Sequence, residues 1–510
     1  MSKPSQSAVV LPAGHSGSSL FHAVLAEAVA QYPDALTSAT LPASPGAFKR
    51  EYGTALARFE AARVRSPARV EIARFIVRRT QRSLGFGSAE SQVPLSEYLA
   101  QRIATPALEH ARLTGPSALA VEVPLDGQIY RGRAVHQALD KLRKAHQLTA
   151  AAHAGLTWIV EHAAAHGGSI DLSGQRFVLF GAGAELASTR MLLAAGASIL
   201  WVDLAEPSRS LGNVNELGGD ITRAPQASNL LEQPREIAAA VRAFAADGPV
   251  HIGMFAYAPG ASKEWRLAAT MNAIVASLEP GLVRSVSLLI SPTTPSVLSS
   301  ETLRSSELRY LETPSWQRVL ERTGLIQRPG YHREGAVSVS LSTVSLQGLS
   351  YQAAQYISKL AAAETYAVYG ADPHADEGEP IAVSANVAGV TRTRSLSHPL
   401  FDAAFLGADR FGVRVFDPAT TRALSGLLML HDLLNPDAPG AAGRHDGQPL
   451  DKAAGVLAQQ IHGGIYTLPF VLEGVIRAAA VAGLVSQPSL LLKNFAPTPR
   501  APALTSAPAE

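Results

Sequence analysis

The segment from residue 170 to about residue 395 alternates short apolar runs with helical patterns, and this alternation constrains the fold more than any other feature. The apolar runs begin at Arg176, Ser198, Val250, Ser285 and Pro380. Helical patterns lie between them, over residues 186–195, 236–246 and 263–278. Strands that are apolar along their whole length are typical of a parallel sheet covered by helices on both faces. The sequence therefore predicts an α/β domain with a doubly wound parallel sheet.

The regions on either side of this domain have a different pattern. Helical periodicity over residues 21–169 predicts a helical N-terminal extension, and the same periodicity over residues 396–495 predicts a helical C-terminal cap. Residues 1–20 and 496–510 are rich in Pro, Ser and Ala without a period, which is typical of disordered segments. A polar stretch over about residues 292–335 interrupts the strand pattern, and we interpret it as an insertion that could form a lid.

Charge and composition exclude several classes of function. The chain carries 44 Lys and Arg against 42 Asp and Glu, so its net charge of +2 creates no overall field for nucleic acid or an anionic membrane. The absence of cysteine excludes disulfides, thiolate-bound zinc and thiol nucleophiles, and we predict no metal site. No run of about 18 apolar residues predicts a membrane span. We expect a cytoplasmic protein with a small-molecule substrate and with no nucleic-acid or membrane partner, and a homo-oligomer is compatible with this composition.

One stretch departs from the overall charge balance. Residues 49–82 contain ten Lys and Arg but only three Glu. Such a stretch can bind an anionic partner, but a solvated or inter-subunit helical face is the simpler interpretation.

A glycine turn follows the first apolar run and carries the main functional signal. Gly181 and Gly183 lie between a predicted strand and a helix, and Asp203 ends the next strand twenty residues after Gly183. Glycines allow the backbone to approach a pyrophosphate, and a carboxylate at this distance can bind the ribose hydroxyls of NAD. The carboxylate would repel a 2′-phosphate, so NAD is favoured over NADP. The same pattern also suits S-adenosylmethionine, or a turn that binds no ligand.

The later segments resemble the short-chain dehydrogenase/reductase family in the order of their features. After the glycine turn come an aspartate, a turn with glycine, a helical asparagine, a serine after the fifth strand, a helix with tyrosine and lysine, and a final turn. These features fall on Asp220, Gly260, Asn272, Ser291, the helix LSYQAAQYISKLAAAE, and Gly389 with Thr391. The resemblance covers residues 170–395 and implies a Rossmann-type domain that binds a nicotinamide dinucleotide. It places Asp220, Gly260, Asn272, Gly389 and Thr391 with the cofactor.

The tyrosine and lysine of this helix are the candidate catalytic groups. The family spacing before Lys359 would place the tyrosine at position 355, where this chain has Gln355, so the candidates are Tyr351 and Tyr356. A tyrosine can donate a proton to the oxygen that becomes negative on hydride transfer, and a neighbouring lysine would lower its pKa. Ser291 could donate a second hydrogen bond to that oxygen. Longer spacings occur in enoyl-thioester reductases of the same superfamily, which favours Tyr351.

Together these features predict an NAD(P)-dependent oxidoreductase, with NAD as the expected cofactor and NADP as the alternative. The reaction would be hydride transfer to or from a carbonyl or an activated C=C bond of an apolar substrate. The alternatives are an S-adenosylmethionine-dependent methyltransferase and a non-catalytic protein that senses nucleotides. The sequence leaves these three functions open.

Overall fold

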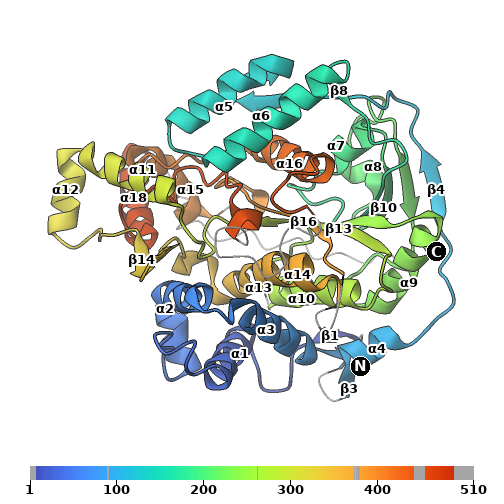
Figure 1. Ribbon diagram of the computed structural model, residues 1–510, viewed down its shortest axis with the longest axis horizontal. Helices are drawn as coiled ribbons and strands as arrows, with labels where there is room; N and C mark the ends of the chain where they lie inside the picture. The colour runs from blue at the N-terminus through green and yellow to red at the C-terminus, as the bar shows by residue number, and fades with distance from the viewer. Residues whose placement is uncertain are drawn as a thin grey trace, which may run out of the picture.

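A seven-stranded, mostly parallel sheet forms the centre of the computed structural model (Figure 1). The structure describes residues 7–88, 91–260, 262–372, 374, 379–396, 398–441 and 454–487. From one edge to the other, the strands are β16 (Ala382–Val387), β13 (Val283–Ile290), β12 (Val250–Met254), β9 (Arg176–Phe180), β10 (Ser198–Val202), β11 (Asp220–Arg223) and β4 (Glu109–Arg112). The five apolar runs predicted to be neighbouring parallel strands are β16 to β10 of this order, so that prediction is confirmed.

The order of these strands reverses direction between β9 and β12. The chain adds β10 and β11 on one side of β9, then returns to add β12, β13 and β16 on the other side. This reversal opens a crevice beyond the carboxyl ends of the two central strands, where open α/β sheets bind ligands. The arrangement is compatible with a Rossmann-type fold.

Successive side chains of the central strands enter two separate hydrophobic cores. Val178 and Phe180 of β9 face one core, whereas Phe177 and Leu179 face the other. Side chains of a strand alternate between the faces of the sheet, so an all-apolar strand requires cover on both. Helices α9 (Pro234–Phe244), α10 (Lys263–Ala276) and α13 (Leu349–Leu360) cover the first face; α6 (Ala150–Ala165), α7 (Thr189–Ala194) and α16 (Pro418–Leu434) cover the second.

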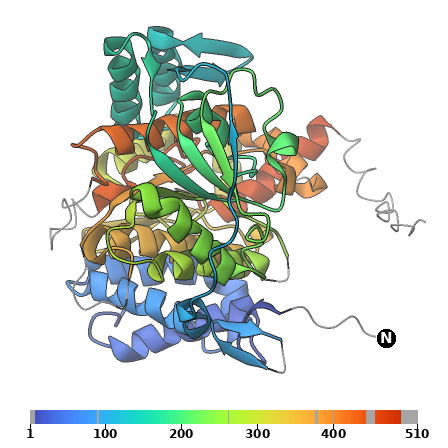
Figure 2. The ribbon, with the colours of Figure 1, turned by 90° about the vertical axis from the view of Figure 1, so that its right-hand side faces the viewer.

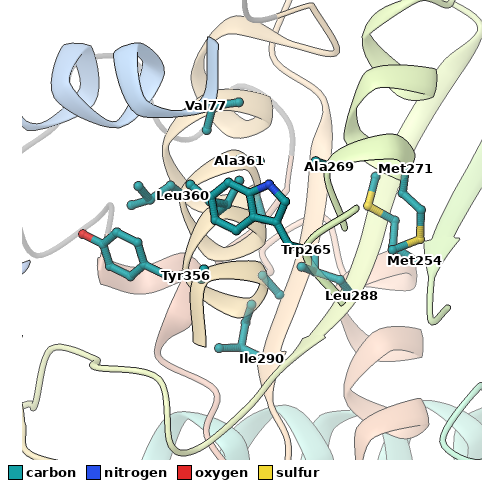
Figure 3. Close-up of a cluster of buried hydrophobic side chains, with 14 of the residues drawn as sticks. Val77, Met254, Trp265, Ala269, Met271, Leu288, Ile290, Tyr356, Leu360 and Ala361 are labelled. Atoms are coloured by element: carbon teal, nitrogen blue, oxygen red, sulfur yellow. The ribbon is translucent and has the colours of Figure 1, made fainter. Parts of the chain in front are cut away.

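The N-terminal helices add an outer layer to the first face. Helices α1 (Gly17–Gln31), α2 (Pro45–Arg65) and α3 (Arg69–Arg82) pack on α10 and α13 (Figure 1). Figure 3 shows part of the shared core, in which Val77 of α3 lies near Trp265 of α10 and Leu360 of α13. On the opposite face, α5 (Val135–Lys144) packs on α6.

The N-terminal region is less separate than its sequence predicts. It contains the predicted helices, but it also supplies β4, which pairs antiparallel with β11 at the edge of the sheet. The segment from α4 (Leu95–Ala100) to β4 runs along this edge, in blue in Figure 2. A second addition is the hairpin of β6 (Glu122–Leu125) and β7 (Gln128–Arg131). The N-terminal region therefore contributes one edge strand to the sheet.

Two further expectations about the ends and the insertion need correction. Residues 8–20 are ordered, because β1 (Ala8–Val10) pairs with β2 (Gly85–Gly87) and the Val9 side chain is completely buried. The insertion holds α11 (Ser300–Leu311), α12 (Ser315–Arg322) and the start of the hairpin β14 (Tyr331–Glu334) and β15 (Val337–Ser340). The hairpin packs on α2. Helices α11 and α12 and the hairpin contribute no lining residue to the cavity at the carboxyl ends of the central strands, so the structure does not place them as the expected lid. The tail 496–510 lies outside the described residues.

The C-terminal region divides into two parts. Helix α16 covers the sheet, whereas α15 (Pro399–Ala408) and α18 (Leu472–Ser486) pair with each other at one end of the molecule (Figure 1). Glycines allow the close approach of this pair, since a Cβ at Gly407 would lie 2.0 Å from the carbonyl oxygen of Ala479. A Cβ at Gly483 would lie equally close, 2.0 Å, to that of Ala403. We call α15 and α18 the cap. Within the described chain, no helix has the length and apolarity that crossing a bilayer requires.

We expect the protein to lose stability in mild acid because it buries two histidines. Burial and nearby cations lower the pKa of His251 to about 4 and that of His462 to about 3. In the unfolded chain both protonate near pH 6.5. The unfolded state therefore binds more protons below that pH, and stability falls as the pH decreases. We expect each histidine to lower the free energy of unfolding by about 2 kcal/mol between pH 7 and pH 5, as measured by urea denaturation. A pH dependence that His251→Gln leaves unchanged would contradict this assignment.

Candidate functional site

A cavity of about 600 Å³ lies at the carboxyl ends of β9, β12, β13 and β16. Each strand is followed by a loop that lines it, through Leu186, Tyr257, Ser291 and Thr391 respectively. The strands are parallel, so their carboxyl ends meet at one edge of the sheet. The volume lies in the range of small-molecule sites. This cavity is therefore the candidate functional site.

Ser291 and Tyr351 meet in the polar part of this cavity. The Ser291 hydroxyl lies 2.8 Å from that of Thr293, and the Ser291 backbone N–H donates to the side-chain oxygen of Gln355 over 2.8 Å. Burial raises the pKa of the Tyr351 phenol, while a hydrogen bond from Ser291 opposes this effect. Tyr351 therefore keeps its proton at neutral pH. The structure thus brings together two of the predicted catalytic residues.

Tyr356 and Lys359 lie on another side of α13, away from the cavity. The Lys359 ammonium donates to Glu60 over 2.7 Å and to the Pro295 carbonyl over 2.5 Å. The Tyr356 hydroxyl donates to the second oxygen of Glu60 over 2.6 Å. Both side chains are buried among α2 and α13, and neither lines the cavity. Lys359 therefore lies beside Tyr356, with its ammonium 5.0 Å from the centre of that ring, whereas it does not line the cavity with Tyr351.

Glu60 belongs to a buried charge cluster that takes up part of the basic stretch, whereas Lys49, Arg50 and Arg58 of that stretch are exposed, as expected. Arg63 forms an ion pair with Glu60 at 2.8 Å and a second with Glu364 at 3.3 Å. The Glu60 and Arg63 side chains are both 2% exposed. The stretch 49–82 therefore presents part of its charge to the protein interior, where a short segment after α13 supplies the second carboxylate.

The glycine turn holds Asp203 directly. The Gly183 backbone N–H donates to one carboxylate oxygen of Asp203 over 2.9 Å, and the Ala205 N–H donates to the other over 2.8 Å. Gly181 has a φ of +82°, and a Cβ there would lie 2.4 Å from the backbone nitrogen of Ala256. Position 181 therefore requires glycine. The turn and the carboxylate are adjacent, as the sequence predicts.

The loop after the glycines is longer than expected. Helix α7 begins only at Thr189 and has six residues, so its N-terminus does not follow the glycines directly. Two arginines reach this loop instead. The Arg394 backbone N–H donates to the Glu185 carboxylate over 2.9 Å, and its guanidinium lies 3.7 Å from the same carboxylate. Arg422 donates to the Glu185 carbonyl over 3.0 Å.

Three expected cofactor residues lie at the same edge of the sheet. Gly389 and Thr391 line the cavity, and the Thr391 hydroxyl lies 2.6 Å from that of Thr421. Gly260 lies in the loop after β12, beside the lining residue Pro259, and its N–H donates to Glu264 over 3.0 Å. Gly389 and Thr391 are thus part of the candidate site, and Gly260 borders it.

Asp220 and Asn272 do not lie where we expected them. Asp220 begins β11 instead of ending it, so it lies at the amino edge of the sheet, opposite the cavity. The Asn272 side chain is 1% exposed and accepts a hydrogen bond from the Tyr366 hydroxyl over 2.5 Å. This hydrogen bond holds the Asn272 side chain of α10 in the protein interior. Neither residue lines the cavity, and both assignments are corrected.

Several polar lining residues were missed from the sequence. Gln347, Gln355 and Glu264 line the cavity. Tyr257 also lines it, and its ring centre lies 5.9 Å from that of Tyr351. Gln355 lies one helical turn after Tyr351, a spacing that places both on one helix face. That spacing was the sequence signal that could have identified Gln355 as a lining residue. No local sequence pattern identifies Tyr257 or Gln347, which lie outside the strands and α-helices.

Comparison of the chain with protein-family models, curated proteins and solved structures finds no significant match.

Proposed function

We propose that this chain is an NAD(P)-dependent oxidoreductase with a Rossmann-type domain, acting on a carbonyl or an activated C=C bond of an apolar substrate. The observation that carries the proposal is the reversal of strand order between β9 and β12, with a glycine turn on β9 and a cavity at the same edge. Dinucleotides bind at such a reversal in open parallel sheets.

The residues around the glycine turn fit a dinucleotide. Asp203 is half-buried and already accepts a backbone N–H from Gly183, and its carboxylate can accept from the two hydroxyls of an adenosine ribose. A Cβ at Gly183 would lie 2.7 Å from the Ser210 hydroxyl, so the glycine lets the turn pack closely against Ser210. Arg394 and Arg422 supply positive charge beside the loop. The N-terminus of α7 does not supply it, because this helix is short and begins several residues after the glycines. NAD is the expected cofactor.

Tyr351 and Ser291 would act on the substrate oxygen. A nicotinamide dinucleotide supplies or accepts the hydride. Tyr351 keeps its proton at neutral pH, so it can donate that proton to the oxygen that becomes negative during carbonyl reduction. Ser291 can donate a hydrogen bond to the same oxygen. Because Lys359 is not beside Tyr351 to lower its pKa, this phenol is a weaker acid than the resemblance implies, and the proposed direction is reduction, which needs the protonated phenol.

Titration of the purified protein with NADH, NADPH and S-adenosylmethionine, followed by calorimetry, tests this proposal. We expect saturable binding of a dinucleotide, with NADH tighter than NADPH. Binding of S-adenosylmethionine alone would instead favour the methyltransferase. Tight dinucleotide binding without turnover on a panel of aldehydes, ketones and enones would favour the nucleotide sensor.

Replacing Asp203 by Ala should weaken NADH binding about tenfold or more, because the ribose hydroxyls lose a charged acceptor. NADPH binding should change less, since its 2′-phosphate does not use this carboxylate. Asp220→Ala is the matched control, because Asp220 lies at the opposite edge of the sheet. Equal effects of Asp203→Ala on both dinucleotides would contradict the assigned role.

A further inference from the structure

We propose that the cap end of the cavity binds the unbranched aliphatic chain of a substrate whose uncharged oxygen-bearing group lies at Ser291 and Tyr351. This inference rests on the proposed function and names the substrate class of the same site. The chain-binding part, here called the apolar chamber, is lined by Ala404, Phe405, Ala408, Val475, Ile476 and Ala479.

The apolar chamber has walls of a single chemical kind. Its residues come from the two cap helices, and all six are aliphatic or aromatic. The glycine contacts at Gly407 and Gly483 bring α15 and α18 together at backbone distance, so the walls contributed by the two helices are held in fixed positions. Such walls offer no hydrogen bond to water or to a polar substrate group. They favour a ligand that presents only methylene groups.

The polar end of the same cavity selects an uncharged group. Ser291, Thr293, Gln347 and Gln355 offer hydrogen bonds there. Glu264 also lines this part. Burial raises the pKa of the neighbouring tyrosines Tyr257 and Tyr351, and the Glu264 charge adds to this effect.

A substrate carboxylate at this point would meet like charge. Among the described lining residues the positive charge comes from Arg394, which pairs with Glu185 beside the glycine turn, where the dinucleotide pyrophosphate is proposed to bind. The substrate group is therefore an aldehyde, ketone or alcohol, and the carboxylate is excluded.

Calorimetry with 1-hexanol, 1-octanol and 1-decanol, without dinucleotide, tests the apolar chamber directly. Burial of one methylene contributes about 0.8 kcal/mol, so we expect about fourfold tighter binding for each added methylene. Octanoate should bind at least tenfold more weakly than 1-octanol. Affinity that does not depend on chain length, or octanoate that binds as tightly as 1-octanol, would overturn the proposal.

Two variants and one matched control locate the aliphatic chain of the ligand. Ala404→Phe fills the apolar chamber and should weaken 1-decanol binding at least tenfold. Leu406→Phe lies on the same helix with its side chain 40% exposed, and should bind 1-decanol as the unmodified protein does. Phe405→Ala enlarges the chamber, so 1-dodecanol should gain affinity relative to 1-decanol; this gain keeps the test decisive if Ala404→Phe does not fold. If the two Phe substitutions changed 1-decanol affinity equally, and Phe405→Ala did not increase 1-dodecanol affinity, the aliphatic chain of the ligand would bind outside the apolar chamber.

These outcomes are separate from those of the dinucleotide titration. Alkanol binding without NADH or NADPH binding would contradict the oxidoreductase and leave the apolar chamber as a lipid-chain site. Dinucleotide binding without alkanol binding would contradict the chamber and leave the oxidoreductase.

Discussion

Glu60→Gln should lower the free energy of unfolding by about 3–5 kcal/mol, because it leaves two buried cations without their shared carboxylate. Glu60 lies 2.8 Å from Arg63 and 2.7 Å from Lys359. Burial alone would raise the pKa of Glu60, but the two cations outweigh this effect and hold its pKa at about 2. The carboxylate therefore stays charged in the folded protein at any pH above that value.

Urea denaturation at pH 7 measures this loss of stability. Glu51→Gln is the matched control, since Glu51 lies on the same helix with an exposed side chain. The control should change stability by less than about 0.5 kcal/mol. A loss below about 1 kcal/mol for Glu60→Gln would show that the cluster is accessible to water, because solvent-exposed ion pairs contribute this little.

The same cluster connects the N-terminal helices to the candidate site. Lys359 donates to the Pro295 carbonyl, and residues 291–293 of that loop line the cavity. Loss of Glu60 is therefore expected to loosen the loop that positions Ser291. Amide exchange of residues 291–298 in Glu60→Gln, compared with Glu51→Gln, would report this coupling.

Tyr351→Phe should reduce turnover about 10²-fold or more while leaving dinucleotide affinity unchanged. The reason is that Tyr351 lies in the cavity with Ser291 and provides the proton in the proposed reduction. Steady-state kinetics with NADH and an aldehyde accepted by the unmodified protein measure kcat, and calorimetry measures the affinity for NADH.

Tyr356→Phe provides the matched control on the same helix. Its hydroxyl donates to Glu60 in the buried cluster, so this substitution should lower stability by about 1–3 kcal/mol without a comparable loss of kcat. The opposite result, with turnover lost in Tyr356→Phe and retained in Tyr351→Phe, would move the catalytic site to the far side of α13.

Tyr351 and Lys359 show what helical periodicity can predict about a site and what it cannot. At about 100° per residue, the two side chains are about 80° apart around the helix, so both were candidates for one site. In the structure, the cavity lies beside Tyr351, and Glu60 of α2 lies beside Lys359. Periodicity gives the direction of each side chain relative to its neighbours in the helix, but it does not say which other segment lies in that direction.

Local sequence patterns were sufficient to predict the strands and the glycine turn. Burial of β9 on both faces requires apolar residues at successive positions, and this pattern is visible in the sequence alone. Gly181 requires a residue without a Cβ because of its φ of +82°, and only glycine satisfies that need without strain. The distance from Gly183 to Asp203 is the combined length of the loop after the glycines, α7 and β10.

The tertiary structure alone decided the site. β4 joins the sheet from a region more than sixty residues before β9. Asp220 lies at the beginning of its strand. Lys359 forms its hydrogen bond with Glu60 of α2 and not with Tyr351. The apolar chamber likewise forms only when α15 and α18 meet. Local propensity and periodicity arise from residues within a few positions of one another, whereas these four features depend on contacts between distant segments. Burial and charge pairing across such contacts set the environment of each functional side chain.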